Sequence, residues 1–340
     1  MNSPERVMAA IAGKPHDRPP FGLVLSLYGA QLIDSRLEDY FRDPDAYTRA
    51  QERILDLFHP DILFGPFALA LLGEAWGSQL KFQKEQAPNV KRPAAKTVSE
   101  FLALPEPDIE GHPSLKFLRE SVRGVVRKTQ GRAVVAMPMM SPIDLPALIL
   151  GLETWIELFL LHPHDVDAVY ERTSRFTAKW CQAIMSEGVG CLVMPAPMLS
   201  CSLLPLHMIE SRSLPLYREF FSTNSFPTLI HHGGERLLPS LLLAARLPPS
   251  VIGFAADARD SLGEVRSLVG PNRVVIGGIE GPQLHAQRED ALREQTRLIL
   301  TDRQDDPHFI FCTTGADVSV HASVDQIRAI ADTIEHFRHE

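Results

Sequence analysis

Histidines and carboxylates that could transfer protons follow short apolar runs in this chain of 340 residues. His231 and His232 end one such run and precede two glycines, and Asp257 and Glu280 follow two later runs. Imidazoles and carboxylates are common general acids and bases. We therefore expect His231, Asp257 and Glu280 to be catalytic. For the two carboxylates, hydrogen bonding to loop N–H groups is the structural alternative.

Other side chains near the ends of these runs could bind a substrate. Neighbouring residues on a strand point to opposite faces, so His231 and His232 should face different ways unless the strand ends between them. Methionine is flexible and polarisable, so a site rich in methionine suits a large flat or hydrophobic ligand, and filling of the core is the equal alternative. We expect the substrate to contact His232, Glu235, Glu74, Met137, Met194 and Asp317.

The elements that must position these residues alternate between strands and helices. Eight runs that are apolar on both faces predict strands of a parallel sheet covered by helices, at 21–25, 61–65, 133–138, 191–195, 228–232, 251–255, 273–278 and 308–313. Helical patterns occupy 45–58, 163–187, 260–269, 288–300 and 323–337. Eight such units favour a closed (β/α)8 barrel, a TIM barrel of the α/β class, in one domain over 1–340 with a helical N-terminal extension. Active sites of such barrels lie at the C-terminal ends of the strands.

The composition limits which binding partners and which cellular compartment we expect. Apolar residues make up 45% and charged residues 22%, which is ordinary for a globular protein. The net charge is −8 and no long basic run is present, so we expect no nucleic-acid partner. The apolar stretch at 142–161 contains three acidic residues, and the chain opens without a secretory signal. We therefore expect a cytoplasmic protein without a membrane span. The four cysteines form no CxxC pair, and Cys312 should be a buried, inert thiol.

Five segments resemble the uroporphyrinogen decarboxylase superfamily, and they occur in the same order as in that superfamily. They are SPERVMAAIAGKPHDRPP from residue 3, DILFGPFALALLGEAWGSQLKF from 61, MSPIDLPALILGLETW from 140, LIHHGG from 229 and GGIEGPQL from 277. The superfamily includes the tetrapyrrole decarboxylase and the methylcobalamin:coenzyme M-type methyltransferases. The resemblance implies a (β/α)8 barrel and a homodimer.

The resemblance to the decarboxylases does not extend to their substrate-binding residues. Those enzymes hold substrate carboxylates with arginines after the first strand and an aspartate after the second. Here the segment at 21–30 contains no arginine, and Pro66 stands where the aspartate would be. Because carboxylate groups need cationic partners, we do not expect uroporphyrinogen to be the substrate.

The resemblance to the methyltransferases implies methyl transfer with a corrinoid such as methylcobalamin, or with another methyl carrier, and a small molecule or a corrinoid protein as partner. Their zinc site uses one histidine and two cysteines. His231 matches the histidine, whereas Gly233 and Ala316 stand at or near the cysteine positions. Zinc is therefore doubtful, although a rebuilt site of His231 with Glu235, Asp257, Glu280 or Cys312 is an alternative. Two further alternatives are a decarboxylase or lyase acting on a tetrapyrrole-like or smaller carboxylic acid, with Asp257 or Glu280 handling protons, and a non-catalytic binding or partner subunit.

Overall fold

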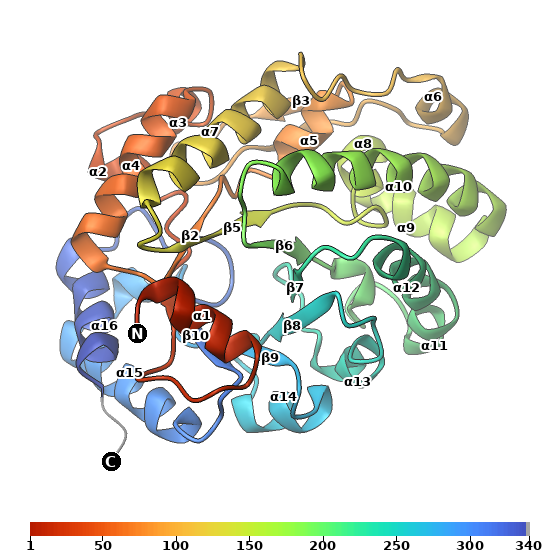
Figure 1. The fold of residues 1–340 in the computed structure, drawn as a ribbon. Coiled ribbons are helices and arrows are strands. Elements are labelled where there is room, and N and C mark those ends of the chain that lie inside the picture. The colour runs from red at the N-terminus through yellow and green to blue at the C-terminus, as the bar shows by residue number, and fades with distance from the viewer. Residues whose placement is uncertain (338–340) are drawn as a thin grey trace.

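The computed structural model of this protein describes residues 1–337. Eight parallel strands lie side by side around one axis in the order β1-β10-β9-β8-β7-β6-β5-β2, with helices outside them (Figure 1). The strands are β1 Phe21–Gly22, β2 Ile62–Phe64, β5 Val134–Pro138, β6 Cys191–Pro195, β7 Thr228–His231, β8 Val251–Ala255, β9 Val274–Gly277 and β10 Phe309–Cys312. Each lies within a run predicted above, so the TIM-barrel prediction is confirmed.

The helices also follow the sequence patterns, and the five predicted ones are present with ends shifted by at most a few residues. Ser323 begins the last helix with a capping box, in which its side chain accepts from the N–H of Gln326 while the Gln326 side chain accepts from the N–H of Ser323. The helices are α1 Ser3–Ile11, α2 Gly29–Leu32, α3 Leu37–Tyr40, α4 Pro44–Phe58, α5 Ala70–Ala75, α6 Val98–Ala103, α7 Pro113–Thr129, α8 Pro146–Leu150, α9 Leu152–Leu161, α10 Pro163–Met185, α11 Leu206–Met208, α12 Leu214–Thr223, α13 Leu241–Ala244, α14 Leu262–Val269, α15 Glu289–Arg303 and α16 Val324–His336. No helix among residues 1–337 is both long and apolar enough to cross a membrane.

Side chains alternate along each strand between the lumen and the outer face of the barrel, so the strands lie between two apolar layers. On β5, Val134 and Ala136 pack in the lumen of the barrel, whereas Val135 and Met137 pack between the sheet and the helices. β6 alternates in the same way, with Met194 in the outer layer. Both faces of each strand are therefore buried, which explains why the strand runs are apolar at successive positions.

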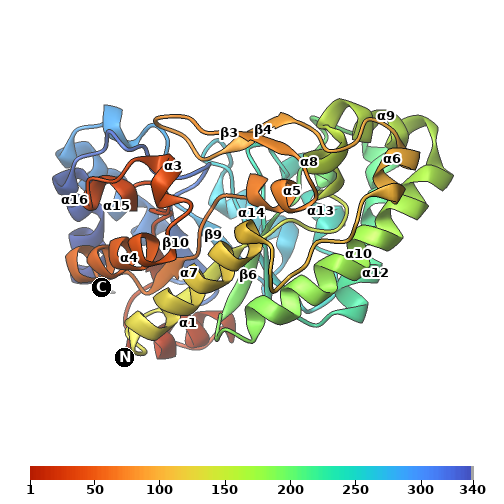
Figure 2. The same cartoon turned by 90° about the horizontal axis from the view of Figure 1, so that it is seen from above.

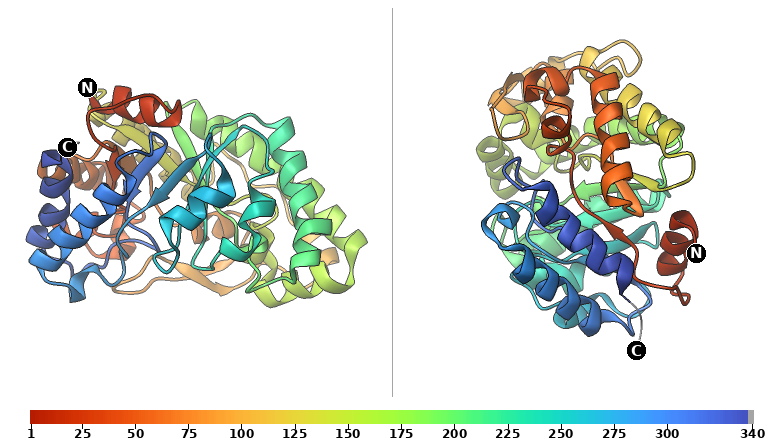
Figure 3. Two further views of the ribbon diagram at one scale, coloured as in Figure 1. Left: turned by 90° about the horizontal axis from the view of Figure 1, so that it is seen from below. Right: turned by 90° about the vertical axis from the view of Figure 1, so that its left-hand side faces the viewer.

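The two ends of the barrel are closed differently. Helix α1 places Val7 and Ala10 against the lumen residues and so covers the end where the strands begin. The antiparallel hairpin of β3 (Gln79–Lys81) and β4 (Asn89–Arg92) lies at the opposite end of the barrel from α1 (Figures 2 and 3). The hairpin is therefore on the side where the strands end.

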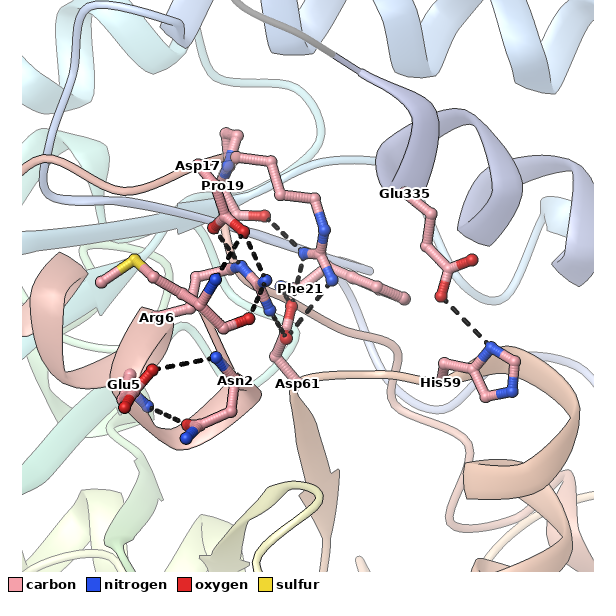
Figure 4. Close-up of polar contacts among 11 residues, drawn as sticks. Asn2, Glu5, Arg6, Asp17, Pro19, Phe21, His59, Asp61 and Glu335 are labelled. Atoms are coloured by element: carbon pink, nitrogen blue, oxygen red, sulfur yellow. Dashed lines mark hydrogen bonds and ion pairs between the residues drawn. The ribbon is translucent and has the colours of Figure 1, made fainter.

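β1 and β2 are at the two ends of this strand order and do not pair directly. Asp61 connects them. Its N–H donates to the carbonyl of Phe21 at 2.8 Å, and its carboxylate accepts from the N–H of Phe21 at 3.0 Å. Arg6 donates to the same buried carboxylate at 2.6 Å (Figure 4). Arg18 donates to it at 2.6 Å as well. Asp17 also binds Arg6, so the Asp-Arg-Pro-Pro turn of the sequence closes the barrel at the end covered by α1.

Candidate functional site

An open cleft of about 590 Å³ lies where the strands end. Its walls come from the loop after β2, from the β3–β4 hairpin and from the loop after β10. The lining residues are Leu27, Phe67, Leu69, Ala70, Gln83, Glu85, Gln86, Ala87, Pro88, Asn89, Leu148, Pro282, Ala316, Asp317, Ser319 and His321. The cleft is thus at the position where barrel enzymes carry their active sites.

A much smaller cavity of about 30 Å³ lies inside the barrel and has Phe67 in common with the cleft. Its walls are largely aliphatic, with His231 and Cys312 among the few exceptions. This volume holds about one water molecule or one methyl group. The Phe67 ring therefore lies between an open cleft and an enclosed apolar space.

His231 enters this cavity as a neutral ring. Its Nδ1 accepts a hydrogen bond from the N–H of Gly233 at 2.9 Å, so the proton of the neutral ring is on Nε2. Burial, together with the neighbouring His232, lowers the pKa of His231 to about 3. The ring meets Phe67 edge to face, with centroids 6.0 Å apart. The Nε2–H of His231 is therefore a hydrogen-bond donor, and the ring is not cationic at neutral pH.

His232 stacks on His231, with ring centroids 4.3 Å apart. The two rings do not face opposite sides because β7 ends at His231. The Nδ1 of His232 faces the N–H of Gly234 at 3.1 Å, and its Nε2 faces the N–H of Gly315 at 3.2 Å. Since a neutral imidazole accepts at one nitrogen only, these two N–H groups compete for the ring. His232 thereby links the loop after β7 to the loop that carries Asp317.

Asp257 lies beside this histidine. One of its carboxylate oxygens is 3.8 Å from Nδ1 of His232, and both oxygens bind Arg259 at 2.7 and 2.8 Å. The hydrogen bond from Arg259 lowers the pKa of Asp257 to about 2. Asp257 is thus a fixed negative charge that can orient His232, rather than a proton donor at neutral pH.

The remaining predicted carboxylates have different surroundings. Glu280 is exposed and pairs through its backbone with Thr314, and Glu235 is half-buried after the histidine pair. Neither is among the residues that line the cleft. Glu74 binds both Arg42, at 2.6 Å to each oxygen, and the hydroxyl of Ser114, so its carboxylate is engaged away from the cleft.

Asp317 does line the cleft, and its carboxyl group is buried. It accepts a hydrogen bond from the N–H of Leu27 at 2.8 Å. Burial raises the pKa of Asp317 to about 8, although backbone hydrogen bonds from Leu27 and Ser26 oppose this shift. Asp317 can therefore exchange a proton near neutral pH, which is the property expected of a general acid or base.

Met137 and Met194 are both fully buried in the layer between the sheet and the helices. Neither lines the cleft or the lumen cavity. The expectation that these methionines contact the substrate is therefore wrong. They fill the core, as the alternative reading held.

Two residues of interest were missed in the sequence. Phe67 stands in an apolar stretch and looks like an ordinary core residue. Asp144 is fully buried, and it accepts hydrogen bonds from the hydroxyls of Ser141 and Tyr217 and from the N–H of Met198. Burial raises the pKa of Asp144 to about 7. Its interruption of an otherwise apolar segment was the available signal, and its role here is to join the loops that follow β5 and β6.

The residues present do not fit the zinc site of the methyltransferases. Among residues 1–337, no group of three or more histidine, cysteine, aspartate or glutamate side chains is arranged to hold a metal. Gly233 has a φ of +66°, and a Cβ there would lie 3.2 Å from the Cβ of Pro195. Burial raises the pKa of Cys312 to about 12, so this thiol is protonated. The described residues therefore do not supply the ligands of that zinc site.

Parallel strands enclosed by helices, with a cleft where the strands end, define a TIM-barrel protein of the α/β class. The family model of uroporphyrinogen decarboxylase (URO-D) matches residues 2–337, and the chain belongs to this family. A search of curated protein sequences found no significant match.

Similar solved structures include a methyltransferase from Methanosarcina mazei, with a TM-score of 0.87, 14% identity and coverage of 98% of both chains. A B12-independent methionine synthase from Shewanella sp. W3-18-1 has a TM-score of 0.58 at 10% identity and covers 88% of this chain and 89% of its own. A putative vitamin-B12 independent methionine synthase from Listeria monocytogenes has a TM-score of 0.53 at 11% identity and covers 95% and 98%. At these identities the likeness is one of fold.

Proposed function

We propose that this protein is a methyltransferase that binds its methyl-bearing ligand in the cleft and works with a corrinoid or another methyl carrier. One observation carries the proposal. The cleft has no lysine or arginine among its lining residues, all of which are described, and it leads past Phe67 to an apolar cavity of methyl size. The similar structures of a methyltransferase and of a methionine synthase agree with this reading.

The charge of the cleft favours methyl transfer over decarboxylation of an acidic substrate. A carboxylate substrate needs cationic groups to hold it, and no lysine or arginine lines the cleft. A methyl group carries no charge of its own, and its transfer depends on alignment of donor and acceptor and on exclusion of water. The aliphatic walls and Phe67 provide such surroundings.

The chain's own residues have defined tasks in this proposal. Asp317 holds or releases a proton at the cleft wall, and His231 offers an Nε2–H donor at the boundary of the cavity. His232 and Asp257 position the loops that carry these groups. A carrier would supply a methyl group that can be displaced, or a nucleophile that accepts one.

Titration of the protein with methylcobalamin tests the choice of carrier. Ala316 is exposed and lines the cleft, so Ala316→Trp should fill the cleft without disturbing the core. We expect the wild type to shift the absorption spectrum of methylcobalamin and Ala316→Trp to lose most of that shift. Ala291→Trp, on the exposed side of α15, is the matched control and should behave as the wild type. No shift with the wild type would contradict a corrinoid as the carrier, and an equal shift with Ala316→Trp would contradict binding in the cleft.

A further inference from the structure

The charged groups of the cleft are mainly acidic. Asp317 and Glu85 contribute carboxyl groups, and His321 is the one imidazole among the lining residues, all of which are described. Glu85 and His321 are exposed and lie 3.3 Å apart across the cleft, so they can neutralise each other when the histidine is protonated. Asp317 has no such cationic partner, because no ion pair involves it among residues 1–337.

A buried carboxyl group without a cation is costly when it is ionised. The N–H of Leu27, at 2.8 Å, replaces one of the hydrogen bonds that water would make to Asp317, but it carries no net charge. The nearby phenols of Tyr40 and Tyr47 are fully buried, and burial raises their pKa values well above the usual value, so they remain neutral. A ligand cation in the cleft would provide the missing counter-charge and so stabilise the ionised form.

An aromatic ring stands in the same wall. Phe67 lines the cleft, and its N–H donates to the hydroxyl of Ser26 at 2.8 Å. Ser26 precedes Leu27, which binds Asp317, so one short segment after β1 holds both the backbone of Phe67 and the carboxyl group. An aromatic face next to an anionic group is a favourable environment for a methylated cation, whose charge is spread over apolar groups.

We propose that the cleft binds a small organic cation of the methylated ammonium or sulfonium class, with the Asp317 carboxylate as its counter-charge and Phe67 as its aromatic wall. This inference rests on the proposed function, because it names the class of methyl-bearing ligand. It concerns binding alone, so it is tested without any methyl carrier. Its failure would leave methyl transfer from an uncharged ligand intact, and its success would not depend on turnover.

Two probes of equal shape separate the charge from the size of the ligand. Choline and 3,3-dimethylbutan-1-ol differ by a nitrogen cation in place of a carbon atom. We expect isothermal titration calorimetry near pH 8 to show choline binding at least about tenfold more tightly than the alcohol. Equal affinity, preference for the alcohol, or binding of neither probe would overturn the proposal.

The pH dependence provides a second test on the unaltered protein. The cation binds the ionised carboxyl group, whose pKa in the free protein is raised to about 8. Between about pH 6 and pH 8 the affinity for choline should therefore rise towards tenfold per pH unit and level off above that range. The other titratable residues that line the cleft are Glu85 and His321. If Asp317 is the counter-charge, His321→Gln should keep this dependence. Affinity for choline that does not change with pH would count against Asp317 as the counter-charge.

Asp317→Asn removes the charge and retains an oxygen that can accept from Leu27. We expect its affinity for choline to fall to that of the alcohol and to become independent of pH. Asp305→Asn is the matched control, since Asp305 is exposed and does not line the cleft. Circular dichroism establishes whether each variant is folded. A folded Asp317→Asn variant that still prefers choline as strongly as the wild type would overturn the assignment.

Discussion

The Nδ1 of His231 accepts a hydrogen bond from the N–H of Gly233 at 2.9 Å. In the related methyltransferases, the sequence resemblance places a zinc-binding cysteine at the position of Gly233. Here the same position closes a turn with a left-handed backbone, and its N–H holds the imidazole of His231 at the wall of an apolar cavity. The loop is therefore built for a neutral imidazole.

Gly233→Cys should destabilise the protein without creating a zinc site. A side chain at a φ of +66° is strained, and its Cβ would lie 3.2 Å from Pro195. We expect a loss of about 1–3 kcal/mol in the free energy of unfolding, measured by urea denaturation. Ala316→Cys, at an exposed position, should cost little. One zinc per chain in the variant that carries both substitutions, with unchanged stability, would contradict this expectation.

His231→Asn should make the protein less sensitive to acid. The pKa of His231 is about 3 in the folded protein and near 6.5 when the chain is unfolded. Its contribution to stability is therefore fully present above about pH 6.5 and is lost as the pH falls towards 3. The asparagine oxygen can still accept from Gly233, but it does not titrate. The free energy of unfolding of the variant should fall less steeply over this range than that of the wild type.

His164→Asn is the control for that measurement, because His164 is exposed at the start of α10. It should follow the wild-type curve. If His164→Asn and His231→Asn shift the acid unfolding curve equally, burial of His231 does not control the acid response.

Asp61→Asn should be among the most destabilising single changes in the chain. It removes the negative charge that Arg6 and Arg18 share and leaves two buried guanidinium groups without it. We expect a loss of about 3–5 kcal/mol in the free energy of unfolding. Asp17→Asn, which affects a more exposed partner of Arg6, should cost clearly less. Equal costs would indicate that Asp61 does not hold β1 and β2 together.

The fold was predictable because a parallel strand that is covered on both sides is apolar at every position. The same property concealed which way each residue points. Met137 and Met194 stand at strand ends, as an active-site residue would, yet the alternation of β5 and β6 turns them towards the helices. The face to which a side chain points depends on the register of the strands, and an apolar run does not reveal that register.

The candidate site was predictable in part for a similar reason. Asp317 was expected from its place after the last strand, and the structure places it in the cleft. Glu74 was expected from its place after β2, but its carboxylate binds Arg42 from a distant segment. Phe67 has no chemical signature in the sequence. Its position between the cleft and the cavity depends on how the loop after β2 packs, which is a long-range property.

Methyl transfer itself is tested most directly by methylation of cob(I)alamin under anaerobic conditions. A panel of methylated ammonium, sulfonium, ether and thioether compounds is supplied as donors, and formation of methylcobalamin is followed by absorbance. We predict that at least one donor reacts at least about tenfold faster with the wild type than without protein, and that Ala316→Trp abolishes this gain while Ala291→Trp keeps it. No acceleration with any donor, or equal acceleration by Ala316→Trp, would contradict a methyltransferase acting in this cleft.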